Sequence, residues 1–389
     1  MSTGEERRRR EAVARRLGGE PVEEVARAVG RSRQWVARWV GRYEPTDPNW
    51  ARERSRAARR VANRTPVAVE AQVLEVRERL VANPWAQIGA EAIAWELEKL
   101  GISPPTTRTI ERILARSGAA RRSRRERPSA KGVPYPTPPC EAVGDLHQAD
   151  LVGPRHLDGG EPFIALNMVD VAAHAGGIEI TADEREETIC GALMSLWERH
   201  GVPRRLQLDN GKPFIVGGGT LGEVVRLCLH QGTTPVFIPQ GEPWRNGVVE
   251  HYNDTFDKRF FRSERFGSRE VLRTRAGEFE RFHNDNHRYR ATGRRTPVEV
   301  VGDIVPRQPT LPAELPPGWP ERGQVEFIRF IRSDRKLRLL RRQITMPDQL
   351  AYRYVTATLD LSIPTTEENL LVHHEGELIT RSQIPIKGR

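Results

Sequence analysis

The sequence predicts a multidomain protein: all-α units at the N-terminus, then an α/β core, then a small β-barrel or sheet at the C-terminus. Length is the first observation, because 389 residues exceed the roughly 100–200 residues of a single domain. The second is a change of periodicity, since helical spacing before residue 120 gives way to alternating strands and helices between 144 and 300. The third is a set of short strand-like runs over 324–389.

Charge and cysteine content narrow the class of protein. A net charge of +10 favours a polyanionic partner, and nucleic acid is the usual one, although a basic protein without such a partner remains the alternative. The three cysteines are far apart and include no CxxC pair, which argues against a disulfide framework or a Cys-based zinc site. The charged start and the lack of an apolar run of about 18 residues predict neither a signal peptide nor a membrane span.

Residues 1–45 are expected to form a helix-turn-helix unit. Apolar residues recur at helical spacing over 22–29, Gly30 is a turn residue, and Ser32 is a plausible N-cap for the next helix. A short helix, a tight turn and a second helix with Arg and Gln near its start is the arrangement that reads DNA, although a helical hairpin with a solvated face is the alternative. The expected DNA contacts are Arg33, Gln34 and Arg38.

A linker over 46–66 precedes a second helix-turn-helix candidate at 67–120. Asn83-Pro84 and Gly101 end its first two helices, and a Ser-Pro-Pro run leads into the third. We expect DNA contacts from the start of this third helix, at Thr107, Arg108 and Arg112.

Two further linkers flank the core. The Arg run within 121–143 is suited to lie along phosphates, although a solvated linker that binds nothing is the alternative, and the Pro-rich part that follows is expected to be stiff. The Pro-rich segment 301–323 separates the core from the C-terminal β domain at 324–389.

Three acidic residues of the core are the candidate site. Asp150 lies in the first strand, Asp209 at the end of the fourth before an Asn-Gly pair, and Glu250 one turn into a helix that opens with another Asn-Gly pair. Strand ends and helix starts are where α/β folds collect functional groups. Nearby carboxylates repel one another unless divalent cations neutralise them, and two Mg²⁺ or Mn²⁺ ions about 4 Å apart suit phosphoryl transfer.

Taken singly, each of these acids is more often a turn, cap or helix-dipole residue. Other acids of the same region are alternatives: Asp145, Asp158, Asp170 and Glu242.

The stretches around the three acids, LHQADLVGP, LQLDNGKPF and PWRNGVVEHYN, resemble the catalytic core of the retroviral integrase superfamily. More closely, they are similar to integrase-type transposases of bacterial insertion sequences, as are the paired helical units and the C-terminal β region. The resemblance implies an RNase H-like fold with an Asp-Asp-Glu metal site. It favours Glu250 over Glu242, because Glu250 occupies the NGxxE position, and Asp150 over Asp145, because the aspartate should lie late in its strand.

The resemblance implies a transposase that cuts DNA at the ends of a mobile element and joins the 3′-OH to target DNA. Its partners would be double-stranded terminal inverted repeats and target DNA, bound by a homodimer or a larger assembly in the cytoplasm, associated with the nucleoid. Lys212, Arg245 and Asn246 flank the carboxylates and are candidates to position the scissile strand. A silent transposase acting as a DNA-binding regulator and a metal-dependent nuclease without joining are the alternatives.

Overall fold

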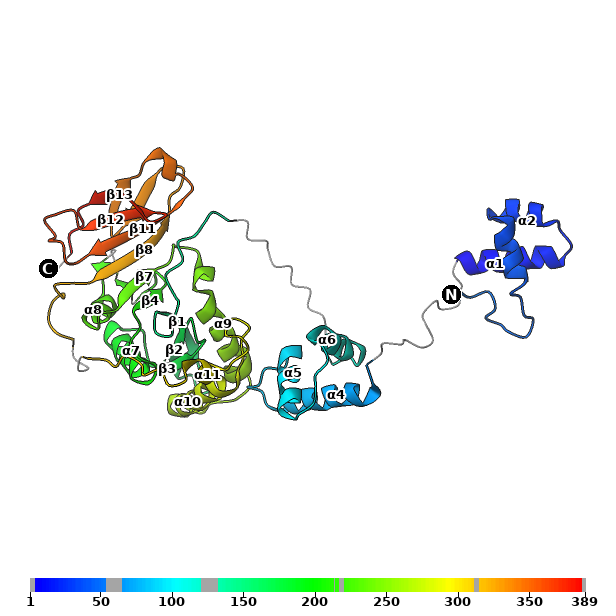
Figure 1. Cartoon of the computed structure of the whole chain (residues 1–389), viewed down its shortest axis with the longest axis horizontal. Coiled ribbons are helices and arrows are strands. Elements are labelled where there is room, and N and C mark those ends of the chain that lie inside the picture. Colours follow the sequence, from blue (N-terminus) through cyan, green and yellow to red (C-terminus); the bar gives the residue numbers. More distant parts are fainter. Residues whose placement is uncertain are drawn as a thin grey trace. The chain divides into compact units, whose positions relative to one another are not determined.

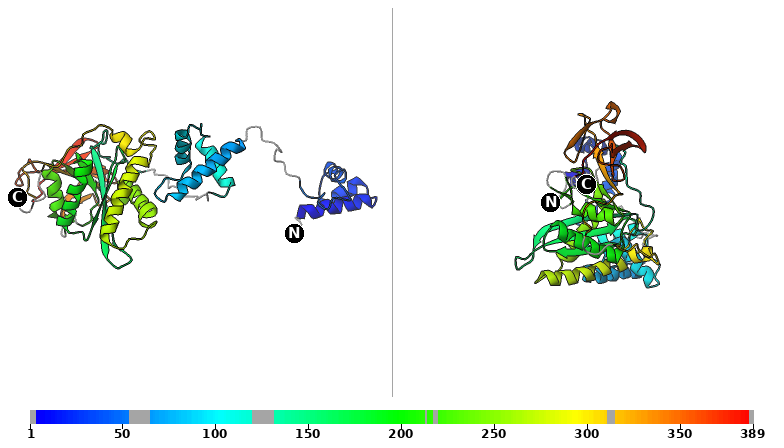
Figure 2. Two further views of the ribbon diagram at one scale, coloured as in Figure 1. Left: turned by 90° about the horizontal axis from the view of Figure 1, so that it is seen from below. Right: turned by 90° about the vertical axis from the view of Figure 1, so that its left-hand side faces the viewer.

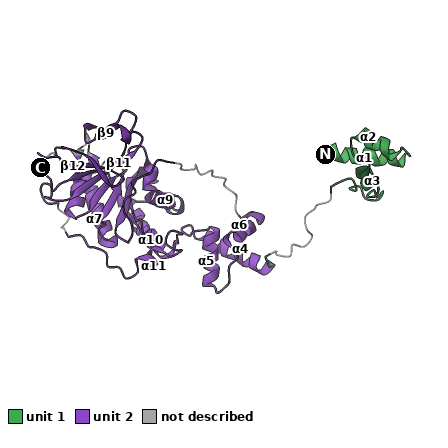
Figure 3. Cartoon of the chain, turned by 45° about the horizontal axis from the view of Figure 1, so that its top comes forward, with its two compact units in different colours: residues 1–66 green, residues 67–389 purple. Residues whose placement is uncertain are grey.

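The computed structural model describes residues 4–53, 65–119, 132–212, 214–216, 220–310 and 315–386. It divides into two compact units, residues 1–66 and 67–389 (Figure 3). The basic run expected at 121–143 falls mostly on 120–131, outside the described residues. No helix in the described parts of the chain is both long and apolar enough to cross a membrane.

The first unit is a bundle of three helices: α1 (Gly4–Leu17), α2 (Val22–Val29) and α3 (Arg33–Val40). Gly30 ends α2 with a φ of 63°, a left-handed conformation that glycine adopts without a Cβ clash. The Ser32 hydroxyl accepts a hydrogen bond from Trp35 N and caps α3. Val36 and Trp39 are buried against the other two helices, so the predicted helix-turn-helix geometry is present.

The second unit begins with three more helices: α4 (Val67–Ala82), α5 (Ala90–Lys99) and α6 (Thr107–Arg116). Their loop at 83–88 packs onto the core, because the Trp85 ring contacts Phe260, Phe279 and Phe282 edge-on. Trp85 Nε1 also donates to Glu264 at 2.8 Å. This helical group therefore belongs to the same compact unit as the core.

A nine-stranded mixed sheet forms the centre of the second unit (Figure 1), in the order β13-β12-β11-β8-β7-β4-β1-β2-β3. Strands β1, β2 and β3 pair with one another in antiparallel fashion, and β4, β7 and β8 run parallel to β1. The strands are β1 (Leu146–His156), β2 (Pro162–Asp170), β3 (Gly176–Thr181), β4 (Arg205–Leu208), β7 (Thr234–Phe237), β8 (Gln324–Phe330), β11 (Tyr354–Asp360), β12 (Leu370–His374) and β13 (Glu377–Ser382).

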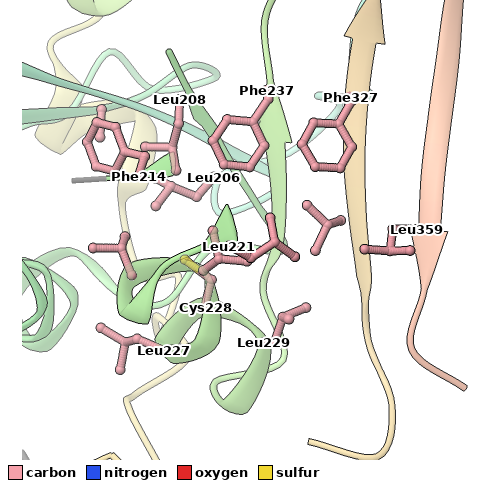
Figure 4. Close-up of a cluster of buried hydrophobic side chains, with 14 of the residues drawn as sticks. Leu206, Leu208, Phe214, Leu221, Leu227, Cys228, Leu229, Phe237, Phe327 and Leu359 are labelled. Carbon is pink, nitrogen blue, oxygen red and sulfur yellow. The ribbon is translucent and has the colours of Figure 1, made fainter. Parts of the chain in front are cut away.

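Helices cover both faces of this sheet (Figure 2). One face packs against α7 (Glu186–His200) and α8 (Glu223–His230), and Figure 4 shows this core where β4, β7 and β8 meet α8. The other face packs against α9 (Gly247–Thr255), its π-helical continuation η2 (Phe256–Phe261) and α10 (Arg269–Asn286). Short elements complete the unit: β5 (Ile215–Val216), β6 (Thr220–Leu221), η1 (Pro243–Asn246), α11 (Pro297–Val301), β9 (Lys336–Leu339), β10 (Arg342–Thr345) and η3 (Asp348–Leu350).

The C-terminal strands are present as predicted, but they do not form a separate sheet. Strand β8 pairs in parallel with β7, and Phe327 stacks on Phe237 at 5.1 Å between ring centroids. Both rings are fully buried. Strand β7 would otherwise be an exposed edge with unpaired backbone groups and apolar side chains, and β8 covers it. The region 324–386 thus completes the core, and the hairpin β9–β10 is the part that forms its own small sheet.

Candidate active site

Asp150 lies in β1, opposite Asn167 of β2. Its Oδ2 accepts a hydrogen bond from Asn253 Nδ2 at 2.7 Å, and Asn253 Oδ1 in turn accepts one from Asn167 Nδ2 at 2.7 Å. The pKa of Asp150 is raised to about 6, first by burial and then by the negative charges of Asp209 and Glu250. Asp209 and Glu250 therefore both lie within electrostatic reach of Asp150.

Asp209 directly follows β4, which is the parallel neighbour of β1. Its Oδ1 accepts a hydrogen bond from Gly211 N at 2.9 Å, which folds the chain back over the carboxylate. A Cβ at position 211 would lie 3.1 Å from the same oxygen, tighter than an ordinary contact. Glycine at 211 therefore leaves room for the Asp209 carboxylate.

Asn210 ties the loop after Asp209 to strand β8. Its Nδ2 donates to Ile238 O at 2.6 Å, and its Oδ1 accepts from a guanidinium nitrogen of Arg329 at 2.7 Å. The other terminal nitrogen of Arg329 donates to three backbone carbonyls at the ends of β7 and β8, at 2.8 to 3.3 Å. Burial lowers the pKa of Arg329 to about 10, so the group stays charged at neutral pH. A C-terminal strand thus positions the Asp209 loop.

Glu250 lies in the first turn of α9, and three polar residues hold this turn over β1 and β4. Gln148 Oε1 accepts from two backbone N–H groups of the turn, at 3.0 and 3.1 Å. Asn246 donates to a carbonyl of β1 at 3.1 Å and accepts from Gln207 Nε2 at 3.2 Å. Gln148 and Gln207 each lie two residues before one of the aspartates, so these bonds join the elements that carry all three acids.

The other acids of the region have structural partners. Asp145 and Asp170 each accept hydrogen bonds from two backbone N–H groups. Asp158 forms an ion pair with an arginine at 3.0 Å. Both oxygens of Glu242 accept from the Tyr354 hydroxyl, at 2.9 and 2.8 Å. These contacts explain each of the four acids without a metal.

The geometry and the donor type of the trio bear differently on metal binding. Among the described residues, no group of three His, Cys, Asp or Glu side chains is close enough to hold a metal ion. Asp150, Asp209 and Glu250 nevertheless offer carboxylate oxygens, the donors that Mg²⁺ and Mn²⁺ prefer. The repulsion that raises the pKa of Asp150 is the kind that a bound cation neutralises. The three carboxylates are therefore suitable donors for Mg²⁺ or Mn²⁺. Their side chains would have to move closer together to bind one ion jointly.

The predicted DNA contacts of the helical units lie on helix surfaces. Arg33, Gln34 and Arg38 are exposed on α3, and Arg33 forms an ion pair with Glu23 at 3.3 Å. On α6, the arginines are exposed and the threonine is half-buried, at positions Thr107, Arg108 and Arg112. Both helices therefore present polar side chains away from their own hydrophobic cores.

In the core, two of the three predicted DNA contacts have partners within the protein. Lys212 is exposed beside Asp209. Arg245 lies over the Tyr135 ring at 3.9 Å and donates to Glu242 and to the Tyr354 hydroxyl, each at 3.0 Å. Asn246 is 3% exposed, and its amide is engaged at both ends. Through these contacts Arg245 and Asn246 hold the start of α9. Nearness in sequence to an acid does not decide which way a side chain points.

Five polar residues that build the site were not singled out in the sequence. Some carried a signal: Asn253 is three residues after Glu250 on the same helix face, and the two glutamines share a strand face with the aspartates. Asn210 belongs to an Asn-Gly pair, which indicates only a turn, and Arg329 carries no signal because its role depends on the pairing of β8 with β7. The five are Gln148, Gln207, Asn210, Asn253 and Arg329.

Comparison with protein families identifies the N-terminal unit. Residues 3–47 match the model of a homeodomain-like domain. The match covers α1, α2 and α3, including the Ser32 cap and the exposed face of α3. The three N-terminal helices are thus similar to a homeodomain-like domain.

Comparison with solved structures finds distant likenesses to viral integrases. The HTLV-2 integrase catalytic core domain in complex with magnesium (dimeric form) is 15% identical, with a TM-score of 0.33, and the match covers 42% of this chain and 99% of the other. The catalytic core domain of BIV integrase is 18% identical over 40% and 93% of the two chains, with a TM-score of 0.31. The simian T-cell lymphotropic virus intasome in complex with PP2A regulatory subunit B56 gamma is 14% identical over 76% and 96%, with a TM-score of 0.37.

Proposed function

We propose that this protein is a transposase of the integrase type, which cuts DNA at the ends of a mobile element and joins the 3′ ends to target DNA. Asp150, Asp209 and Glu250 are the proposed catalytic residues and metal ligands. The homeodomain-like unit and the second helical group, α4 to α6, would bind the DNA.

One observation carries this proposal: the hydrogen bonds that lock the start of α9 onto β1 and β4. Gln148, Gln207 and Asn246 make these bonds, and each lies within four residues of one of the three acids. The network joins the elements that carry the three carboxylates, and the charges of Asp209 and Glu250 contribute to the raised pKa of Asp150. A perturbed pKa at the point where two parallel interior strands carry acids favours a functional site over a structural one.

The proposed reaction has two steps at one site. Asp150, Asp209 and Glu250 would hold divalent ions, which would supply Lewis-acid stabilisation to phosphoryl transfer. The protein's own groups hold the site: Asn253 donates to Asp150 Oδ2, and the backbone of Gly211 donates to Asp209 Oδ1. Water attacks a phosphodiester at the element end and leaves a 3′-OH. That 3′-OH then attacks a target phosphodiester, so one bond forms as another breaks.

A second candidate function is a DNA-binding regulator that has lost the chemistry. The observation that favours it is the lack of a closed metal-binding group among the described residues. The presence of all three acids on the elements that the α9 hydrogen bonds join favours the enzyme. A metal-dependent nuclease that cuts without joining is the third candidate.

The test uses the full chain, Mg²⁺ or Mn²⁺, and labelled DNA carrying the inverted repeats that flank its gene. The transposase proposal expects both a nicked product with a 3′-OH and a joined product, and neither from Asp150→Asn or Asp209→Asn. Asp158→Asn is the matched control, because it removes a surface carboxylate of the same domain. Cutting without joining would indicate a nuclease, and binding without products a regulator; either outcome would overturn the proposal.

A further inference from the structure

The hairpin β9–β10 and its flanks concentrate positive charge. Residues 332–343 contain six basic side chains in twelve residues and a single acid. The members are Arg332, Arg335, Lys336, Arg338, Arg341 and Arg342. Most of these side chains are exposed, so the hairpin is a basic surface rather than a buried ion-pair network.

Two carboxylates offset part of this charge. Asp334 pairs with Arg338 at 2.6 Å, and Asp348 pairs with Arg335. Within the described part of the chain, no carboxylate forms an ion pair with Arg341 or Arg342. Side chains of one sign held this close repel one another. A negatively charged partner would relieve this repulsion at Arg341 and Arg342.

The tip of the hairpin has an unusual backbone. Leu340 and Arg341 both have positive φ, 46° and 63°. Two-residue hairpin turns of this kind are normally made by Asn-Gly or a similar pair, because side chains with a Cβ are disfavoured there. A strained turn that holds an arginine at its tip is typical of a functional surface rather than of a turn chosen for stability.

Clefts on the hairpin reach Arg329, which binds the loop of the proposed active site. A cleft of about 470 Å³ is lined by four basic residues, Arg329, Arg332, Lys336 and Arg338, and by the acids Glu242 and Asp334. A second of about 390 Å³ is lined by Gln240, Arg338, Arg341 and Arg342. Gln240 lies two residues after Ile238, whose carbonyl accepts from Asn210, the residue after Asp209. Arg329 lines both clefts and also donates to Asn210, so it connects the clefts to the loop that follows Asp209.

We propose that the β9–β10 hairpin binds the phosphate backbone of the DNA duplex that enters the active site, a role that rests on the function proposed above. Arginine forks suit phosphate oxygens, and the surface offers charge without an array of aromatic or amide groups to read bases. The contact would thus be independent of sequence, as a target duplex requires. It gives the C-terminal strands a role in binding besides their role in the sheet.

The test compares two charge-matched double variants of the full chain, both carrying Asp209→Asn and assayed without metal, so that binding is measured apart from cutting. Arg341→Gln with Arg342→Gln removes the hairpin tip charge. Arg322→Gln with Arg381→Gln removes two exposed arginines elsewhere in the C-terminal region. Affinity for a labelled duplex of arbitrary sequence is measured by anisotropy at several salt concentrations.

The hairpin variant should bind about tenfold more weakly at low salt, with the slope of log K against log salt reduced by about 1 to 2, whereas the control should match the parent. The helix-turn-helix contribution is equal in both and cancels. Equal affinities and slopes for the two variants would overturn the inference. Failure of the proposed function would appear separately, as absence of cut or joined products from the wild-type chain with metal.

Discussion

At the scale of single residues, the site contains carboxylates that repel one another. Asp150 is buried, and its pKa is raised to about 6 by burial and by its two acidic neighbours. In a folded state that prefers the protonated acid, ionisation lowers stability as pH rises through the folded pKa. The metal-free protein therefore contains a destabilising carboxylate at neutral pH.

Replacing Asp150 with Asn should stabilise the metal-free protein at pH 7.5 by about 1–3 kcal/mol, because the amide carries no charge. The gain should shrink as pH falls through about 6 and vanish near pH 4, where the wild-type acid is protonated. Urea unfolding at several pH values measures this. Asp145→Asn is the contrast and should destabilise, because Asp145 accepts two backbone hydrogen bonds. A destabilised Asp150→Asn at pH 7.5 would contradict the repulsion.

Arg329 is the residue by which a C-terminal strand positions the Asp209 loop. Arg329→Met should lower the free energy of unfolding by about 2–4 kcal/mol, because Asn210 and three buried carbonyls lose a charged donor. Hydrogen exchange over residues 209–212 should rise more than over the rest of the sheet. Arg381→Met, an exposed arginine of β13, should change neither quantity. Uniform exchange in the Arg329 variant would mean that the bond to Asn210 positions nothing.

At the scale of elements, the start of α9 is the part that brings Glu250 to the aspartates. Gln148→Ala leaves two N–H groups of the first turn of α9 without their acceptor. We expect a loss of about 1–3 kcal/mol in stability and at least a tenfold loss of DNA cutting, measured by chemical unfolding and by nicking of labelled DNA. Gln308→Ala, at an exposed glutamine, is the control. Normal cutting by the Gln148 variant would show that Glu250 needs no such support.

At the scale of the whole molecule, the C-terminal strands complete the core sheet. A fragment ending at residue 320 would expose the edge of β7 and the Phe237 ring that Phe327 covers. It should lose cooperative unfolding or aggregate, whereas the fragment 67–389 should unfold in one transition measured by circular dichroism. An independent C-terminal domain would predict a stable shorter fragment, and that result would contradict the shared sheet.

The extent to which the fold and site followed from sequence depends on the range of the interactions. Local signals were sufficient for the Ser32 cap, the Gly30 turn and the order of strands and helices, because caps and periodicity act over a few residues. Pairing of β8 with β7 joins positions some 90 residues apart, and a strand pattern does not name its partner. For the same reason the sequence does not indicate the role of Arg329, nor the bonds by which Arg245 and Asn246 hold other residues of the protein.

The most direct test of the central claim is the joining of DNA by two single variants, Glu250→Gln and Glu242→Gln. Both remove one negative charge near the start of α9. The proposed trio predicts that Glu250→Gln abolishes cut and joined products in Mg²⁺, while Glu242→Gln, which loosens only the contacts to Tyr354 and Arg245, keeps measurable joining. Full activity of Glu250→Gln with loss of activity in Glu242→Gln would contradict the trio and assign the third ligand to Glu242.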